Sequence, residues 1–159
     1  MLFLPQRPYM ILGSLRAQLL YPATHQAVSE ATLRCVLEQV HLAELPERVG
    51  GWDVELDWAD ILSLGEQQLL AFARLLLTQP QYAILDEATS ALDVKNEAHL
   101  YRVLQATGIT YISAGHRPSV LQYHQHVLEL TGEGRWRLLP VETYMREEGN
   151  PSQPFMSQP

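Results

Sequence analysis

The segment "YAILDE" at 82–87 constrains the fold more than any other part of this chain. Four mostly apolar residues run directly into two adjacent acids, Asp86 and Glu87. The apolar run is too uniform for a strand with one solvated face, so we expect a strand buried in a parallel sheet. Carboxylates are costly to place at the end of a buried strand unless a cationic group meets them. The two acids therefore predict a ligand site at the carboxyl edge of that sheet.

Other periodic segments complete an α/β pattern. Strands are predicted at 2–4, 82–85, 109–113, 126–130 and 135–139, and the last two form a hairpin. Helices are predicted within 13–22, 29–40, 65–79 and 93–106. This alternation indicates an α/β sheet with parallel members. The first sixty residues carry little strand signal, so we expect a helical lobe inserted into the sheet, with a turn-rich, solvated connector at 50–61.

Composition limits the class of protein. Apolar residues at 47% and charged residues at 18% are typical of a globular chain. The 11 Lys and Arg against 18 Asp and Glu give a net charge of −7, which argues against a nucleic-acid surface. Cys35 is the only cysteine, which excludes an internal disulfide and fits a reducing compartment. The longest apolar stretch, 69–77, is interrupted by Arg74 and falls short of the ~20 residues that span a bilayer.

Three further polar features lie at the ends of predicted elements. Gln6 follows the first strand, and His116 follows the strand at 109–113. Ser63 and Gly65 stand at the start of the longest helix, where free N–H groups and the helix dipole attract phosphate. Taken singly, these features have ordinary interpretations: a loop glutamine, a surface histidine and a capped helix. The Asp-Glu pair has one too, since backbone amides could satisfy it.

Together and in this order, the features resemble the nucleotide-binding domain of ABC transporters over about residues 1–140. Gln6 matches the Q-loop, "LSLGEQ" at 62–67 the signature motif, and "YAILDE" the Walker B motif. "SALD" at 90–93 matches the D-loop, and His116 matches the switch histidine. The stretches "GGWDVELDWADILSLGEQQ", "HRPSVLQYHQHVLEL" and "GEGRWRL" are similar to subfamily D exporters, the peroxisomal acyl-CoA transporters and bacterial relatives that move peptides or cobalamin.

The resemblance implies a partial P-loop NTPase fold, a parallel core sheet with an inserted helical signature lobe. On this basis we expect an ATPase domain fragment over 1–147, with the lobe at about 14–80 and the core sheet at 81–140. A disordered, Pro- and Ser-rich tail is expected at 148–159. The implied partners are a transmembrane domain and a second ATPase domain in a head-to-tail dimer, at the cytoplasmic face of a membrane. No nucleic acid is implied.

The resemblance also implies ATP and Mg²⁺ as cofactors and gives roles to the strand-end residues. Asp86 would hold Mg²⁺ through water, and Gln6 would sense the same ion and report to the transmembrane domain. Glu87 would act as the general base. His116 would contact the γ-phosphate and the attacking water.

Residues of the signature motif and D-loop would act across the dimer. Ser63 and Gly65 would touch the γ-phosphate of ATP held by the other subunit, Glu66 belongs to the same nucleotide-binding set, and Asp93 would bridge the subunits. Leu64 stands where the family usually has glycine, and Glu66 where it has glutamine. A Cβ at position 64 restricts the backbone if φ must be positive there. The charge of Glu66 is unfavourable near phosphate unless the side chain points away.

One element of the family pattern is missing from the sequence. No G-x-x-x-x-G-K-[ST] occurs, since the only lysine is Lys95. The phosphate-cradling loop, the strand before it and the adenine-stacking aromatic are therefore missing. We expect an internal or mis-assigned start at Met1, or a truncated gene. We also expect an isolated chain that is inactive, with the apolar flank of "YAIL" uncovered.

Two other functions stay open. The chain could be a non-catalytic module that only pairs with an intact cassette. It could also be a DNA-associated ATPase of the structural-maintenance-of-chromosomes type, in which a long coiled coil separates the Q-loop from the signature. The short stretch between Gln6 and Leu62 contains three prolines, at 8, 22 and 46, and no heptads, which disfavours that class. Arg74 is assigned no catalytic role. The three tryptophans are predicted to be packing residues.

Overall fold

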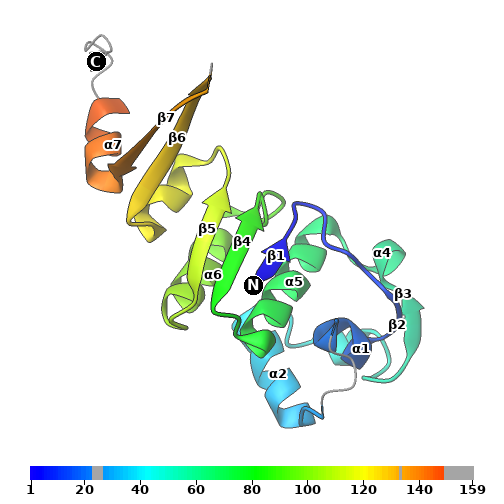
Figure 1. The fold of residues 1–159 in the computed structure, drawn as a ribbon. Coiled ribbons are helices and arrows are strands. Elements are labelled where there is room, and N and C mark those ends of the chain that lie inside the picture. Colours follow the sequence, from blue (N-terminus) through cyan, green and yellow to red (C-terminus); the bar gives the residue numbers. More distant parts are fainter. Residues whose placement is uncertain (23–26, 133, 149–159) are drawn as a thin grey trace. The chain divides into compact units, whose positions relative to one another are not determined.

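The computed structural model describes residues 1–22, 27–132 and 134–148, and the chain divides into two compact units, 1–116 and 117–159 (Figure 1). The expected disordered tail lies outside the described residues except for residue 148, which ends a helix. The segment expected as core sheet, 81–140, is divided between the two units. Within the described ranges, no helix is both long enough and apolar enough to cross a membrane.

The first unit is built on the predicted parallel sheet. Its strands are β1 (Leu2–Leu4), β4 (Tyr82–Asp86) and β5 (Thr110–Ala114), in the order β1-β4-β5, and both pairings are parallel. The expected uncovered flank of β4 is wrong, because β1 of this same chain pairs along one edge and β5 along the other. The central position of β4 fits its uniformly apolar sequence.

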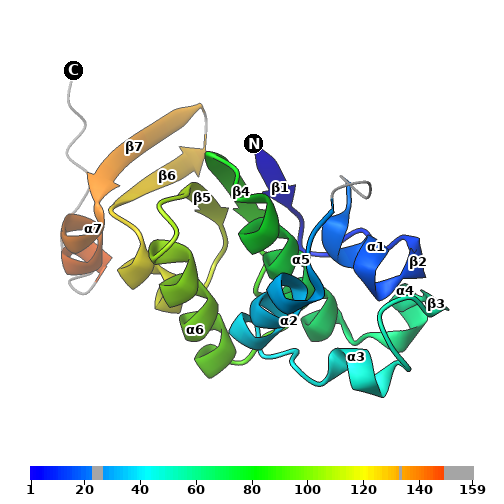
Figure 2. The same ribbon diagram turned by 90° about the horizontal axis from the view of Figure 1, so that it is seen from below.

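Two helices lie on the same side of this sheet, α5 (Leu64–Thr78) and α6 (Val94–Gln105) (Figure 2). The buried strand residues are Leu4, Ala83 and Leu85. Phe3 and Ile112, which line up across the sheet through β4, are 54% and 68% exposed. The structure therefore covers one face of the sheet and leaves apolar side chains on the other.

Helix α5 is the centre of the first unit. Ser63 caps its first turn, and Gln79 ends it in a left-handed conformation. Every residue from 67 to 76 is buried, so the helix has no solvated face over this stretch, as expected of a core helix. Helices α1 (Leu15–Leu20) and α2 (Glu30–Gln39) pack against it, as their apolar faces predict.

The lobe around these helices contains strands that the sequence did not predict. Strands β2 (Leu12–Ser14) and β3 (Glu55–Asp57) are short and pair antiparallel. Helix α3 (Leu45–Arg48) precedes β3 in the chain, and α4 (Trp58–Ile61) follows β3 directly. The prediction of a turn-rich connector at 50–61 was wrong in its structure, because β3 and α4 lie within it, although its four acids are solvated as expected. Trp52 and Trp58 are buried there, and Trp58 Nε1 donates to the carbonyl of Gly13 at 2.6 Å. Three-residue strands far apart in sequence give no local pattern to detect.

The second unit contains a 3₁₀ helix η1 (Pro118–Tyr123), a hairpin of β6 (His126–Gly132) and β7 (Arg135–Pro140), and α7 (Val141–Glu148). The hairpin confirms the prediction, whereas α7 was not predicted. Trp136 is 66% exposed, so its prediction as a packing residue was wrong. It lies on a two-stranded ribbon, where alternate side chains face solvent.

Candidate active site

Three parallel strands bring the strand-end residues together. Gln6 follows β1, Glu87 follows β4, and His116 follows β5 after a two-residue step. Because the strands are parallel and in register, their carboxyl ends share one edge of the sheet. Gln6 Nε2 donates to Glu87 Oε2 at 2.8 Å, and His116 Nδ1 lies 3.1 Å from Glu87 Oε1. The structure thus joins three residues that lie far apart in the sequence.

Both carboxylate oxygens of Glu87 are occupied in this arrangement. An ionised carboxylate only accepts hydrogen bonds, so this contact is a hydrogen bond in the form of His116 that carries a hydrogen on Nδ1. The Glu87 side chain is 30% exposed and that of His116 75% exposed, so water reaches the group. A carboxylate that accepts from two exposed side chains can take a proton once either is displaced, which is the property of a general base.

The backbone of Glu87 is held in an unusual conformation. Its φ is 47°, in the left-handed region, which is uncommon for residues other than glycine, asparagine and aspartate. Its N–H donates to the carbonyl of Ala114 at 2.9 Å, which continues the pairing of β4 with β5 by one residue. Backbone strain of this kind clusters at functional sites, where the surrounding structure fixes it.

Asp86 is the last residue of β4 and is exposed. The described residues contain no group of three or more His, Cys, Asp or Glu side chains that could hold a metal ion. Mg²⁺ does not need such a group, because it keeps several waters and uses one or two carboxylates together with substrate phosphates. The oxygens of Asp86 and of the Gln6 side chain, both at this sheet edge, are ligands of the type Mg²⁺ prefers. The residues present therefore fit the ion.

The signature segment forms a capping box at the start of α5. Ser63 Oγ accepts from the Glu66 N–H at 3.3 Å, and Glu66 Oε2 accepts from the Ser63 N–H at 2.9 Å. Arg48 Nη1 contacts Glu66 Oε1 at 2.6 Å. Burial alone raises the pKa of Glu66, but the Ser63 N–H, Arg48 and the Ser63 hydroxyl outweigh it and lower the pKa. The glutamate charge is thus compensated within the lobe.

Leu64 is the first residue of α5, and its φ is not among the positive values in this chain. A side chain at this position therefore adds no strain in this conformation. Gly65 differs, because a Cβ there would lie 3.2 Å from the carbonyl oxygen of Ala91. This close approach brings the loop before α6 against the first turn of α5. Among the described residues, no hydrogen bond joins Ser63 or Glu66 to the group around Glu87.

Asp93 caps helix α6. Its Oδ1 accepts from the N–H groups of Lys95 and Asn96, both at 2.9 Å, and its Oδ2 accepts from Asn96 Nδ2 at 2.8 Å. The Asn96 N–H is the largest influence on the Asp93 carboxyl and lowers its pKa. The side chain is exposed, so it can also meet a second molecule. Asn96 Oδ1 in turn lies 2.8 Å from Nδ1 of His41, at the end of α2.

Two buried polar residues of α5 were missed as contributors to this region. Gln68 is fully buried and contacts the segments around Gln6, Glu87 and Ser90. Arg74, which has no predicted catalytic role, is 7% exposed and holds the segment after Gln6. The available signal was a glutamine and an arginine within an otherwise apolar helix, since buried polar groups are almost always hydrogen-bonded.

Arg74 binds the carbonyl groups of the segment that follows β1 and of α1. Nε donates to the carbonyl of Gln18 at 2.6 Å, Nη2 to Gln18 Oε1 at 2.7 Å, and Nη1 to the carbonyl of Tyr9 at 2.7 Å. The guanidinium also lies 5.6 Å from the Tyr21 ring centroid. Burial lowers its pKa to about 10, because the charge is removed from water.

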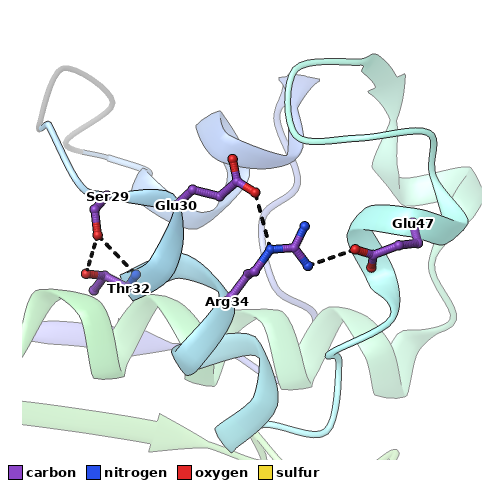
Figure 3. Close-up of polar contacts among 5 residues, drawn as sticks. All are labelled: Ser29, Glu30, Thr32, Arg34 and Glu47. Carbon is purple, nitrogen blue, oxygen red and sulfur yellow. Dashed lines mark hydrogen bonds and ion pairs between the residues drawn. The ribbon is translucent and has the colours of Figure 1, made fainter.

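The surface of the lobe is braced differently, by exposed ion pairs. Arg34 on α2 donates to Glu30 Oε1 at 3.2 Å and to Glu47 Oε1 at 2.7 Å, which links α2 to α3 (Figure 3). Ser29 caps α2 and bonds to Thr32 at 2.8 Å through the two hydroxyl groups (Figure 3). The contact with Glu47 is the largest influence on the pKa of Arg34 and raises it.

Comparisons with known proteins show which sequences are similar to this chain. A family model described as ABC transporter matches residues 12–90. The chain is 54% identical over 141 residues to an uncharacterised ABC transporter ATP-binding protein of Synechocystis, a match that covers 89% of this chain and 21% of that protein. It is 47% identical over 149 residues to the human lysosomal cobalamin transporter ABCD4, a match that covers 89% of this chain and 24% of that protein. It is 46% identical over 173 residues to ABC transporter D family member 2, chloroplastic, of Arabidopsis thaliana, again covering 89% and 24%.

A solved structure agrees over most of the chain. The structure of a bacterial Atm1-family ABC exporter with ATP bound superposes with a TM-score of 0.77 at 27% identity, and the match covers 94% of this chain. It covers 27% of the solved chain. This chain therefore spans about a fifth to a quarter of the length of the relatives that it matches.

Proposed function

Because this chain belongs to the ABC transporter family, as part of the ATP-binding domain, we propose that it supplies the hydrolytic half of an ATPase site that drives transport across a membrane. The observation that carries the proposal is the contact of Gln6 and His116 with the two oxygens of Glu87. A carboxylate flanked by a histidine and an amide, at the carboxyl edge of a parallel sheet, is suited to activating a water molecule.

In this proposal, Glu87 takes a proton from the attacking water. His116 donates a hydrogen bond toward the transferred phosphoryl group and limits where that water can lie. Bound Mg²⁺ would neutralise phosphate charge, and Asp86 and the Gln6 side chain are the residues that would hold it. If the Gln6 side chain held the ion, its amide would no longer bond to Glu87 Oε2, and that oxygen would be free to accept a proton.

The signature residues act on a different nucleotide. Ser63 and Gly65 lie at the start of α5, where the helix N-terminus favours a phosphate group. We assign them, with Glu66, to ATP held by a second ATPase domain. Asp93, exposed at the start of α6, is assigned to the contact between the two domains. The other proposed partner is a transmembrane domain of the same transporter, which would place this chain at the cytoplasmic face of a membrane.

Similarity to D-family members supports a transporter of that subfamily. The human relative is named as a cobalamin transporter and the Arabidopsis relative as chloroplastic. We assign no substrate contact to any residue of this chain. The alternative function is a module that pairs with an intact cassette without hydrolysing ATP, and the assay below separates the two.

An ATPase assay separates the two functions. The chain is tested alone and as an extended protein, in which the ATP-binding residues that precede the matched region of the Synechocystis relative are joined to Met1. We expect no turnover by the chain alone and Mg-dependent turnover by the extended protein. Absence of turnover in the extended protein, at a concentration that gives a dimer by light scattering, would favour the pairing module.

A further inference from the structure

Gln68 is a fully buried glutamine on α5 whose side chain meets three segments of the candidate site. We propose that Gln68 is a positioning residue that sets the segments carrying Gln6, Glu87 and the loop before Asp93 relative to one another, an inference that rests on the proposed function. It lies one turn beyond the signature residues, five positions after Ser63, and touches none of the reacting atoms in this proposal.

The amide nitrogen of Gln68 holds the two strand-end segments. Nε2 donates to the carbonyl of Gln6 at 2.7 Å and to Ser90 Oγ at 3.2 Å, and the carbonyl of Glu87 lies at 3.5 Å. An amide nitrogen has two hydrogens, so the first two bonds use both. Fixing the Gln6 carbonyl fixes the backbone from which the Gln6 side chain reaches Glu87.

The amide oxygen of Gln68 holds the loop before α6. Oε1 accepts from the Ala91 N–H at 2.9 Å, and Ser90 N–H closes the preceding turn onto the carbonyl of Glu87 at 3.0 Å. The carbonyl oxygen of Ala91, in the same loop, would lie 3.2 Å from a Cβ added at Gly65. One carboxamide thus connects the segment after β1, the segment after β4 and the loop that leads to Asp93.

This set of partners requires a carboxamide. The Gln6 carbonyl and the Ser90 hydroxyl accept from the amide nitrogen, and the Ala91 N–H donates to the amide oxygen. A carboxamide offers a donor and an acceptor side by side in one planar group. Methionine has nearly the same length and supplies neither. A purely structural role would also demand buried hydrogen bonds, but it would not demand that all partners belong to segments of the site.

The test uses Gln68→Met with Gln18→Met as its matched control. Gln18 is also a fully buried glutamine, and its amide bonds to Ile11 and Arg74, away from the Glu87 group. In the extended protein, Gln68→Met should lower kcat by about 10- to 100-fold, because a displacement of catalytic groups by about 1 Å has an effect of this size. The KM for ATP should stay within about twofold of the parent value. Gln18→Met should lower Tm to a similar extent and leave kcat within about threefold.

A second readout does not depend on ATP. Hydrogen exchange of the Ala91 amide, followed by NMR in the 159-residue chain, should accelerate at least about tenfold in Gln68→Met, as the loss of one hydrogen bond predicts, and stay unchanged in Gln18→Met. If Gln68→Met does not fold, Ser90→Ala removes one of its acceptors and should still lower kcat about threefold or more at constant KM.

The outcomes are distinguishable. Equal losses of kcat in Gln68→Met and Gln18→Met, or an unchanged Ala91 exchange rate in Gln68→Met, would overturn the positioning role. Lack of turnover by the unmodified extended protein would instead overturn the proposed function, and the exchange measurement would then decide alone whether Gln68 holds these segments.

Discussion

The segment that follows β1 is held at its two ends in opposite ways. At its start, the Gln6 side chain bonds to Glu87, and the groups involved are open to solvent. At its far end, the Tyr9 carbonyl bonds to buried Arg74, which also binds Gln18. Exposed polar contacts contribute little to stability and exchange easily with water or ligand, whereas breaking buried charged ones is costly. The difference separates an end that can respond to a ligand from an end that stays fixed.

This comparison predicts that the responsive end determines turnover and the fixed end determines stability. Neither end is expected to bind ATP, because the 159 residues contain no phosphate loop. That loop supplies several charge-assisted hydrogen bonds of about 1.5–3 kcal/mol each, and a millimolar to micromolar site is worth only about 4–8 kcal/mol in total. Calorimetric titration of the 159-residue chain with Mg-ATP should show no saturable binding. A Kd below about 100 μM would mean that another part of the chain forms a phosphate site.

The next largest effect is expected for Glu87→Gln in the extended protein. Loss of a positioned base should slow hydrolysis by at least about 100-fold while ATP binding is kept. The variant should also accumulate an ATP-bound dimer, measurable by size-exclusion chromatography with multi-angle light scattering. Urea unfolding of the 159-residue chain should change by less than about 1 kcal/mol, because the lost contacts are exposed. Turnover within a factor of two of the parent would show that Glu87 is not the base.

Arg74→Met tests the fixed end. The substitution removes three hydrogen bonds to Tyr9 and Gln18, and removal of a desolvated charge offsets part of that loss, so we expect about 2 kcal/mol of destabilisation. Arg34→Met is the control, since its ion pairs are exposed (Figure 3) and its loss should lower the free energy of unfolding less than Arg74→Met does. Both are measured by urea unfolding of the 159-residue chain. In the extended protein, Arg74→Met should leave kcat per folded molecule within about threefold, and a larger loss would contradict the separation of the two ends.

The smallest effect is expected at the capping box of α5. The folded-state pKa of Glu66 is lowered, so its contribution to stability is present above its ordinary pKa of 4.5 and is lost as pH falls through the lower, folded value. The free energy of unfolding should therefore fall more between pH 5 and pH 3 in the parent chain than in Glu66→Gln, by below about 1 kcal/mol. Parallel curves for the two proteins, measured by urea unfolding at each pH, would show that the cap does not depend on this charge.

The sequence predicted the elements whose signals are local. The apolar run of β4, the capping pattern at Ser63 and the turn between β6 and β7 each lie within a few residues, and each element formed within about two residues of its predicted bounds. The parallel arrangement followed from strand and helix alternation. It placed Glu87 and His116 at one sheet edge, as the structure shows.

The features that were missed depend on contacts distant in sequence. The pairing of β2 with β3 joins two three-residue segments more than forty positions apart. The uncovered flank predicted for β4 was wrong because β1, eighty positions earlier, occupies that edge. Gln68 and Arg74 could be recognised only as polar residues in an apolar helix. Their partners lie on other segments, and no spacing rule within the helix identifies them.

The positive φ of Glu87 has a consequence for how this gene can change over generations. Folding alone gives no reason to retain a glutamate at this position, since glycine or asparagine adopts a φ of 47° more readily. Selection for hydrolysis would hold the glutamate in place against that preference. In a lineage where the chain serves only to pair with another cassette, position 87 would be among the first to drift, whereas buried Arg74 would be retained for folding.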